Sequence, residues 1–211
     1  MKGKFISFEG GEGSGKTTQI QLLAKALEKQ GRKIFVTKEP GGDKSICREI
    51  RALLLDTAHK GLLDDRAELF LFLADRAQHI SKTIMPALES GHTVLCDRFA
   101  ASTFAYQFYA RQVADFNFIK SNNDFAARSL IPDLSFYIDI DPEIGIKRKE
   151  KQTLSRIDAE SMEFHKKVRN GFYKFFKESK WPVEIIDGSV PIENIHNKIL
   201  ERTEKHLKVP S

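Results

Sequence analysis

The glycine-rich stretch near the N-terminus limits the possible folds of this chain more than any other feature. It follows the short apolar run Phe5–Phe8 and has the spacing G-x-x-x-x-G-K-[ST], from Gly10 to Thr17. The glycines let the backbone curl so that consecutive N–H groups face a bound anion. A helix that begins at Lys16 points its positive end at the same place. Because the motif lies between a strand-like run and a helix, we expect a phosphate-binding loop rather than a chance glycine-rich turn.

This loop predicts a site for a nucleoside triphosphate and a divalent metal ion. We expect Lys16 to reach the β- and γ-phosphates of ATP and the Thr17 hydroxyl to bind Mg²⁺. The variable positions of the motif carry no basic side chain, so further positive charge for a transferred phosphoryl group must come from another segment. The residues expected to contact ATP are Gly10, Gly11, Glu12, Gly13, Ser14, Gly15, Lys16, Thr17 and Thr18.

Length and composition fit one globular domain that spans residues 1–211. Of the 211 residues, 41% are hydrophobic and 30% are charged. The apolar runs fall short of the roughly 20 residues that cross a membrane. A strand so close to Met1 leaves no room for a signal peptide, so we expect a cytoplasmic protein. Cys47 and Cys96 have no metal-ligand spacing, and Cys96 is expected to be a small core residue.

The net charge of +5 raises the question of a nucleic-acid partner. Acidic residues are spread through the chain, however, and no long basic block occurs in it. A basic site for small polyphosphates explains the excess equally well. We therefore expect small-molecule substrates, and neither nucleic acid nor a membrane as a partner.

Strand and helix patterns alternate along the chain, which predicts an α/β fold with a doubly wound, five-stranded parallel sheet surrounded by helices. Ligands in such a sheet collect beyond the carboxyl ends of the strands. The expected strands are Lys4–Phe8, Lys33–Thr37, Thr93–Cys96, Leu134–Ile140 and Val183–Ile186. The expected helices are Lys16–Gln30, Ser45–Leu55 with Asp43 as its cap, Asp64–Ser90 with a kink or division at Pro86, Asn117–Ser129, Pro142–Lys151, Glu160–Ser179 and Ile192–His206.

The third expected strand ends in the pair Asp97 and Arg98. An aspartate that closes an apolar strand is a typical second element of the metal site in phosphate-binding-loop enzymes. We expect Asp97 to share Mg²⁺ with Thr17, and Arg98 to face a phosphate. Asp139, at the end of the fourth strand, fits the same pattern, but it lacks a neighbouring arginine. The alternative for Asp97 and Arg98 is an ordinary surface ion pair.

Two further segments leave their interpretation open. Phe72 and Arg76 are four residues apart and share a helix face, which could hold a nucleobase by stacking and a hydrogen bond. A core phenylalanine beside a salt-bridged arginine has the same spacing.

Lys147–Lys151 and Arg156 form a basic segment that is usually a solvated helix face. Because the phosphate-binding loop lacks a second cation, we expect a lid at residues 147–158 in which Arg148 and Arg156 approach the phosphates.

Taken together, these motifs resemble the bacterial thymidylate kinases, P-loop kinases that phosphorylate dTMP with ATP. The resemblance covers nearly the whole chain, and the order and spacing of its blocks are specific. The matching blocks are FEGGEGSGKTTQ, KEPGG, IRALLL, ELFLFLADRAQH, CDRFAASTFAYQ, YIDIDPEIGIKR and SRIDAESMEF.

The resemblance implies roles for the matched residues. Arg51 and Arg98 correspond to ligands of the dTMP phosphate, Phe72 to the aromatic that stacks on thymine, and Arg76 to the arginine that reaches thymine O4. Tyr106 corresponds to the residue that crowds the sugar C2′. The residues implied to line the substrate site are Glu12, Glu39, Pro40, Arg51, Phe72, Arg76, Arg98, Ser102, Thr103, Tyr106 and Gln107. The catalytic set is Lys16, Asp97, Arg98, Arg148 and Arg156.

The chain departs from the family pattern at two places. The turn that usually reads REPGGT is KEPGGD here, which places Asp43 near an anionic substrate unless its side chain turns away. The lid is short, rich in lysine, and ends in Leu-Ser-Arg in place of Leu-Asp-Arg. A lysine offers a point charge without the bidentate geometry of arginine.

The predicted activity is therefore direct transfer of a phosphoryl group from ATP, with Mg²⁺, to dTMP in the synthesis of dTTP. Two alternatives remain at this stage. One is a kinase for another small acceptor, such as a different pyrimidine monophosphate or a deoxynucleoside. The other is a P-loop ATPase whose nucleotide state controls a macromolecular partner. The resemblance also implies a homodimer that pairs through long helices.

Overall fold

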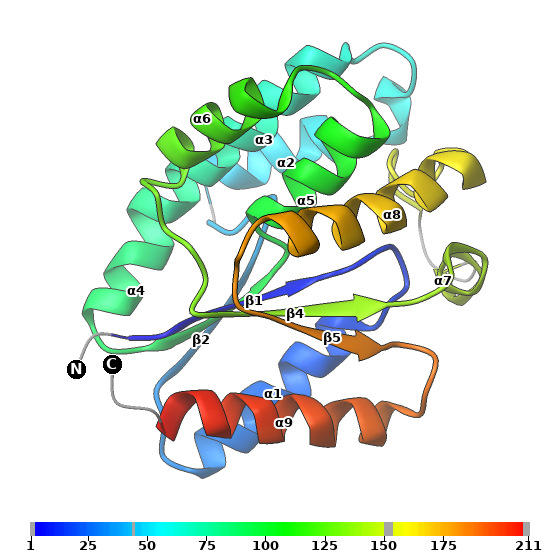
Figure 1. The fold of residues 1–211 in the computed structure, drawn as a ribbon. Coiled ribbons are helices and arrows are strands. Elements are labelled where there is room, and N and C mark those ends of the chain that lie inside the picture. Colours follow the sequence, from blue (N-terminus) through cyan, green and yellow to red (C-terminus); the bar gives the residue numbers. More distant parts are fainter. Residues whose placement is uncertain (1–2, 44, 150–153, 209–211) are drawn as a thin grey trace.

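A sheet of five parallel strands runs through the middle of the computed structural model, which describes residues 3–43, 45–149 and 154–208 (Figure 1). The strands lie in the order β2-β3-β1-β4-β5, so the chain order reverses around β1. Each expected strand is confirmed to within one residue at either end. The strands are β1 (Phe5–Glu9), β2 (Ile34–Lys38), β3 (Thr93–Asp97), β4 (Leu134–Asp139) and β5 (Val183–Asp187).

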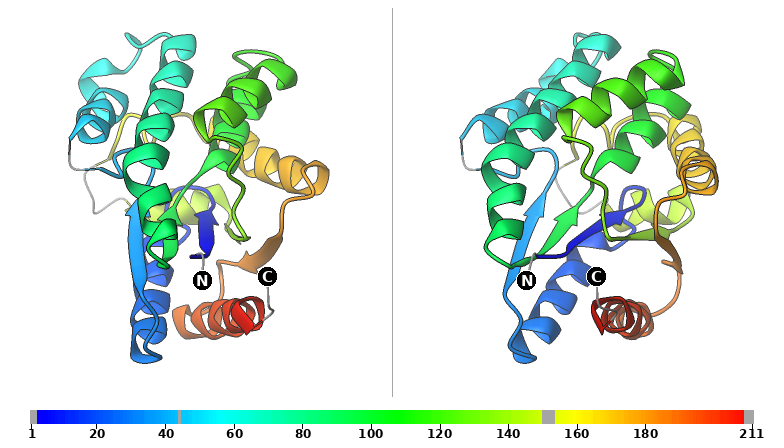
Figure 2. Two further views of the ribbon diagram at one scale, coloured as in Figure 1. Left: turned by 90° about the vertical axis from the view of Figure 1, so that its left-hand side faces the viewer. Right: turned by 60° about the vertical axis from the view of Figure 1, so that its left-hand side comes forward.

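Helices cover both faces of the sheet, as expected for a doubly wound fold. Figure 2 shows α1 and α9 together on one side of the sheet, and the helices between β2 and β4 on the other. The helices are α1 (Lys16–Lys29), α2 (Ile46–Leu55), the 3-10 turn η1 (Thr57–His59), α3 (Asp65–His79), the π-helix η2 (Ile80–Ile84), α4 (Met85–Glu89), α5 (Ala100–Thr103), the π-helix η3 (Phe104–Ala110), α6 (Phe116–Ala126), α7 (Pro142–Lys149), α8 (Met162–Glu178) and α9 (Ile192–Lys208). In the described part of the chain, no helix is long and apolar enough to cross a membrane.

Side chains on β1 alternate between the two faces of the sheet. Ile6 and Phe8 are fully buried in a cluster with apolar residues of α1 and α9, whereas Phe5 packs against η2 and Phe99 on the opposite face. Burial on both faces matches the continuous apolar runs of the parallel strands. Cys96 belongs to the second cluster and is buried, as predicted.

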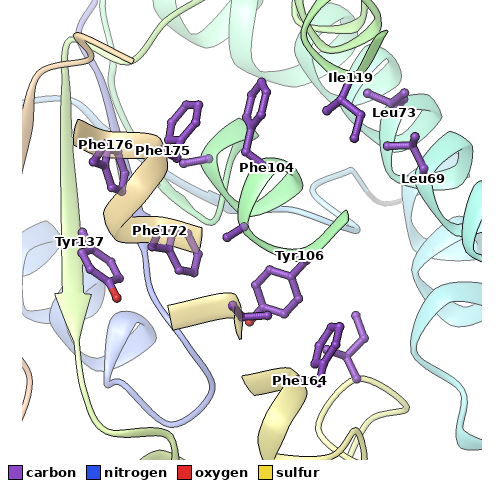
Figure 3. Close-up of a cluster of buried hydrophobic side chains, with 14 of the residues drawn as sticks. Leu69, Leu73, Phe104, Tyr106, Ile119, Tyr137, Phe164, Phe172, Phe175 and Phe176 are labelled. Atoms are coloured by element: carbon purple, nitrogen blue, oxygen red, sulfur yellow. The ribbon is translucent and has the colours of Figure 1, made fainter. Parts of the chain in front are cut away.

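A third apolar cluster ties α8 to η3 and to the far helices (Figure 3). The ring of Phe172 stacks on Tyr137 of β4 at 5.1 Å between centroids, and Phe175 stacks on Phe104 at 4.5 Å. Tyr106, which belongs to η3, contacts Phe172 edge to face. Through these contacts α8 fixes the position of η3 and of the polar residues that η3 carries.

Two features of the helices differ in detail from the prediction or were missed by it. The long helical stretch is divided one turn before Pro86, by the π-helix η2, and Pro86 lies in the first turn of α4. A proline lacks the N–H of the regular ladder and clashes with the preceding turn, so the distortion appears on its N-terminal side. The helical segment Ala100–Ala110 was not predicted. Its few polar residues, Ser102, Thr103 and Gln107, are enclosed among apolar ones, so the sequence shows no exposed polar face.

The predicted capping of α2 by Asp43 is confirmed by its hydrogen bonds, although Asp43 lies two residues before the formal cap position. Ser45 occupies the cap position, and Asp43 precedes it. The Asp43 carboxylate accepts hydrogen bonds from the backbone N–H groups of Ser45, at 2.8 Å, and Cys47, at 3.0 Å. The negative charge of Asp43 is thus directed at the start of a helix. The predicted extension of the Pro142 helix to Lys151 lies outside the described residues.

Candidate active site

The glycine-rich loop after β1 forms a backbone cradle around the Lys16 ammonium. Gly15 has a φ of 93°, a left-handed conformation, and α1 begins at the next residue. The Lys16 side chain is buried and donates to the carbonyl oxygens of Gly10, at 3.1 Å, and Gly11, at 2.8 Å. Burial, followed by the nearby Arg98 guanidinium, lowers the pKa of Lys16 to about 8, although neighbouring carboxylates oppose this shift.

The same loop touches the backbone of α7 directly. A Cβ atom on Gly13 would lie 1.9 Å from the carbonyl oxygen of Gly145, and one on Gly145 would lie 2.2 Å from that of Glu12. No side chain fits at such distances, so glycine on both segments permits the contact. The basic end of α7 is therefore held next to the phosphate-binding loop.

A hydroxyl and a carboxylate meet where a metal ion is expected. The Thr17 hydroxyl donates to Asp97 Oδ2 at 2.6 Å. Asp139, the competing candidate, is instead engaged by Arg169 at 2.7 Å and by the Tyr137 and Tyr173 hydroxyls. Among the described residues no group of three or more His, Cys, Asp or Glu could hold a metal. Two oxygen donors beside a phosphate cradle fit Mg²⁺, which keeps several waters and uses substrate phosphates as further ligands.

A large cavity of about 1040 Å³ opens over this cradle; we call it the larger cavity. It runs from the glycine-rich loop to the loop between β5 and α9, which the sequence analysis did not identify. That second loop is also at the carboxyl edge of the sheet, so inspection beyond every strand, β5 included, would have found it. Its lining includes Gly13–Gln19 of the loop and α1, Asp97 and Arg148, and Gly188–Glu193 of the β5–α9 loop.

A second cavity of about 220 Å³ lies beside it, between the turn after β2, α3 and η3; we call it the smaller cavity. The structure places every residue of the implied substrate site on its wall. Their contacts with a substrate remain predictions. The lining residues are Glu12, Glu39, Pro40, Arg51, Phe72, Arg76, Arg98, Ser102, Thr103, Tyr106 and Gln107, together with Leu55, Phe99, Lys149, Ser155, Ile157 and Asp158, which the sequence analysis did not place there.

The two cavities meet at a cluster of charges around Glu12. Arg98 donates to Glu12 Oε1 at 2.6 Å, and the Tyr106 hydroxyl donates to the same oxygen at 3.0 Å. Burial opposes ionisation of Glu12, but Arg98, Lys16 and Lys149 outweigh it and hold the pKa of Glu12 below its usual range. Arg98 has a φ of 71°, unusual for a side-chain-bearing residue and typical of functional sites. The residues that line both cavities are Glu12, Glu39, Arg51, Arg98 and Lys149.

Arg76 and Phe72 combine features of both interpretations that their spacing allowed. Arg76 is buried in an ion pair with Glu39 at 2.8 Å, and it also lines the smaller cavity. Phe72 packs on the core cluster with only part of its surface and turns another part toward the cavity. Arg76 is therefore salt-bridged, as the structural interpretation expects. Phe72 nevertheless offers an aromatic surface to the cavity, as the base-binding interpretation expects.

The comparisons with known proteins agree with this geometry. The family described as thymidylate kinase matches residues 8–199. A thymidylate kinase of Thermoanaerobacter sp. (strain X514) is 42% identical over 207 residues, which cover 98% of this chain and 100% of that protein. The thymidylate kinase of Caldanaerobacter subterraneus subsp. tengcongensis is 40% identical over 208 residues, covering 99% of this chain and 98% of its own. The chain belongs to the thymidylate kinase family. It is accordingly an ATP-dependent nucleoside monophosphate kinase.

The polar residues of η3 and its neighbours are already engaged within the protein. The Ser102 hydroxyl donates to Glu9 at 2.6 Å, Thr103 accepts from Arg76 at 2.8 Å, and the Gln107 amide donates to Glu68 at 2.9 Å. For a member of the thymidylate kinase family, this means that the wall of the smaller cavity is fixed before any nucleotide binds.

The basic residues expected in the lid divide into two groups. Arg148 lines the larger cavity and donates to the Gly188 carbonyl oxygen at 3.1 Å. Lys149 lines both cavities, contacts Glu12 at 3.2 Å and pairs with Asp158. Arg156 is buried, pairs with Glu68 and donates to the Leu54 carbonyl oxygen at 2.9 Å. Arg156 lines neither cavity, because Glu68 attracts its guanidinium into the helical layer. Residues 150–153, which include Lys151, lie outside the described part.

Proposed function

We propose that this chain transfers the γ-phosphoryl group of ATP to dTMP, with ATP in the larger cavity and dTMP in the smaller one. The observation that carries the proposal is the shared wall of the two cavities at Glu12 and Arg98, beside the phosphate cradle. Direct phosphoryl transfer needs the donor and acceptor phosphates to meet in line, and a shared wall allows this. The reaction then requires alignment and charge neutralisation, without a covalent intermediate.

The residues around the phosphates have distinct proposed tasks. Lys16 binds the β- and γ-phosphates, and Thr17 and Asp97 hold Mg²⁺, which neutralises phosphate charge when it is bound. Arg51 and Arg98 lie at the junction of the cavities, where they bind the acceptor phosphate. Arg98 reaches that position because its backbone turns at the end of β3.

The far end of the smaller cavity suits a pyrimidine base. Phe72 offers an aromatic face for stacking, and Arg76 offers a hydrogen-bond donor to a ring carbonyl. Tyr106 closes the side of the cavity, where an extra ribose hydroxyl would meet its ring. These features support dTMP over purine and ribonucleoside acceptors.

A coupled ADP-release assay with ATP and a panel of nucleoside monophosphates tests the proposal. We expect turnover with dTMP to exceed turnover with every other acceptor. Equal turnover with a second pyrimidine monophosphate would favour a broader kinase. ADP release that is the same with and without an acceptor would favour an ATPase switch, for which no feature of the smaller cavity provides a reason.

We further propose a homodimer that pairs through the outer surface of α2, α3 and α6, which lie together on one side of the molecule (Figure 2). Phe70 and Phe118 form an edge-to-face pair there at 6.4 Å while both remain partly exposed. An apolar helix face of this kind is suited to a two-fold interface. Light scattering across a concentration series should give about twice the 24.0 kDa chain mass. A strict monomer at micromolar concentration would exclude the dimer.

The cytoplasmic location stays a prediction.

A further inference from the structure

His79 is buried beneath the smaller cavity without lining it. It is the last residue of α3, three positions after Arg76, and its side chain has no exposed surface. Its Nδ1 atom lies 3.1 Å from Glu39 Oε1, and its Nε2 atom lies 2.6 Å from the Thr37 hydroxyl. The ring thus connects the end of α3 to two residues at the carboxyl end of β2.

The charge on Glu39 fixes the direction of the first hydrogen bond. Burial raises the pKa of the Glu39 carboxyl, but the Arg76 charge and the His79 contact outweigh burial, and the pKa is lowered. Glu39 is therefore ionised at neutral pH, and a carboxylate only accepts hydrogen bonds. The proton must reside on His79 Nδ1, which donates to Glu39 Oε1.

The other oxygen of Glu39 holds the cavity arginine. Glu39 Oε2 accepts from Arg76 Nε at 2.9 Å and lies 2.8 Å from Arg76 Nη2. Arg76 Nη1 donates to Thr103, at 2.8 Å, and to Asn123, at 2.5 Å. A guanidinium has five N–H groups. In the part of the chain that the structure describes, these contacts leave one N–H of Nη2 for a ligand in the smaller cavity.

The histidine ring has no room to move. A Cβ atom on Gly42 would come within 2.1 Å of His79 Nε2, so the turn after Pro40 packs directly on the ring. The neighbouring Asp75 accepts from the Gly41 N–H at 2.8 Å, which fixes the same turn from α3. Glu39 is therefore held by a ring whose own position is fixed on the opposite side.

We propose that His79 is a positioning residue for the acceptor. By donating to Glu39 Oε1 it sets the plane of the carboxylate, and that plane orients the remaining Arg76 N–H toward the base. The inference rests on the proposed binding of dTMP in the smaller cavity. His79, which lies outside the cavity, would thereby help to distinguish a base with a ring carbonyl from one with a ring amino group.

Two amide substitutions separate the two nitrogens of the ring. In His79→Asn the amide nitrogen takes the place of Nδ1, so the donor to Glu39 is kept. In His79→Gln the amide takes the place of Nε2, so the contact to Thr37 is kept and the donor to Glu39 is lost. We expect His79→Gln to raise the KM for dTMP about tenfold, the size of one charge-assisted hydrogen bond, with the KM for ATP unchanged. The ratio of kcat/KM for dTMP to that for dCMP should fall in the same variant. His79→Asn should stay close to the unmodified protein in both readouts.

Two controls keep the test decisive if His79→Gln folds poorly. Thr37→Val removes the hydroxyl on the other side of the ring and should leave the KM for dTMP unchanged. Ile80→Val loses one buried methylene next to His79, so it shows what loss of thermal stability alone does to the kinetics. Equal effects of His79→Asn and His79→Gln, or a rise in KM for Thr37→Val or Ile80→Val, would overturn the proposal. Arg76→Lys tests the cavity itself: if it leaves the KM for dTMP unchanged, the placement of dTMP has failed instead.

Discussion

The two cavities of this protein are built in different ways. The larger cavity is lined along one side by one continuous stretch, Glu12–Gln19, which joins the glycine-rich loop to α1. The smaller cavity has walls of side chains from the turn after β2, from α2, α3, α5 and η3, and from the segment before α8. In the smaller cavity nearly every polar group has a protein partner, as the Glu39–Arg76 pair shows.

The difference suits the ligand proposed for each cavity. A triphosphate is recognised by its charge and by its position relative to a metal ion. Backbone N–H groups and one lysine are enough for this recognition. A base must be told apart from similar bases, which needs donors and acceptors in fixed positions. Changes in the larger cavity should therefore act on turnover, whereas changes in the smaller one should act on dTMP affinity.

Lys16→Ala should show the first half of this comparison most strongly. The loss of the only phosphate-binding ammonium of the loop should lower kcat by a factor on the order of 10³. Calorimetric titration should show unchanged binding of dTMP, because we propose that the acceptor binds in the smaller cavity. Loss of dTMP binding in a folded variant would contradict the separation of the two sites.

Arg148 and Lys149 test whether the lid residues that line the larger cavity contribute to phosphoryl transfer. Arg148→Ala and Lys149→Ala should each lower the single-turnover rate by about 10²-fold, since both side chains line the cavity proposed to hold the ATP phosphates. Lys149 is expected to show this effect because it is the basic residue on the described part of the lid that lines both cavities.

Arg156→Ala gives the matched comparison within the same segment. Its buried pair with Glu68 predicts a loss of about 3 kcal/mol in the free energy of unfolding, with a smaller effect on turnover. The sequence-based prediction for Arg156 was a role in phosphoryl transfer. A drop in single-turnover rate at unchanged stability would support that role and require Arg156 to leave Glu68 during the reaction.

Glu9, at the end of β1, is fully buried and accepts hydrogen bonds from the Phe99 N–H and from the Ser102 hydroxyl. Burial raises the pKa of Glu9 from 4.5 to about 7, although the Ser102 hydrogen bond and Arg98 oppose it. Between those values the folded state keeps a proton that the unfolded state has lost. The stability from this proton is full below pH 4.5 and is lost as the pH rises through 7.

The variant Glu9→Gln should remove this dependence. The unmodified protein should lose up to about 3 kcal/mol of its free energy of unfolding between pH 4.5 and pH 8 through Glu9, and the variant should not. The difference in free energy of unfolding, variant minus unmodified protein, should therefore rise by that amount. Urea denaturation at both pH values measures this. An unchanged slope in the variant would mean that Glu9 stays ionised throughout.

Arg76→Lys should have the smallest effect of these variants. It tests whether a change in the smaller cavity acts on dTMP affinity rather than on turnover. Lysine keeps the charge beside Glu39 but loses the bidentate geometry. The KM for dTMP should rise about tenfold, while the KM for ATP and kcat change little. If the variant instead only lowers the melting temperature, Arg76 is a structural ion-pair partner and does not read the base.

Sequence patterns predicted the parts of the protein whose physics is local. The glycine spacing indicated the phosphate cradle, and the apolar runs indicated all five strands, because both depend on neighbouring residues. Asp97 could be preferred over Asp139 from its adjacent arginine, and the structure pairs Asp97 with Thr17. The helical segment Ala100–Ala110 escaped prediction because most of its residues are buried, so its sequence shows no regular alternation of apolar and polar faces.

Only the tertiary structure decided which side chains share a wall. The sequence by itself determined the sheet, the loop that binds phosphate and the list of residues available for a second ligand. It could not tell that Arg156 pairs with Glu68, that Lys149 reaches Glu12, or that His79 supports Glu39. Those contacts join segments from 40 to 137 residues apart. Such pairs are selected by how helices pack over the sheet, and no local pattern in the chain records that packing.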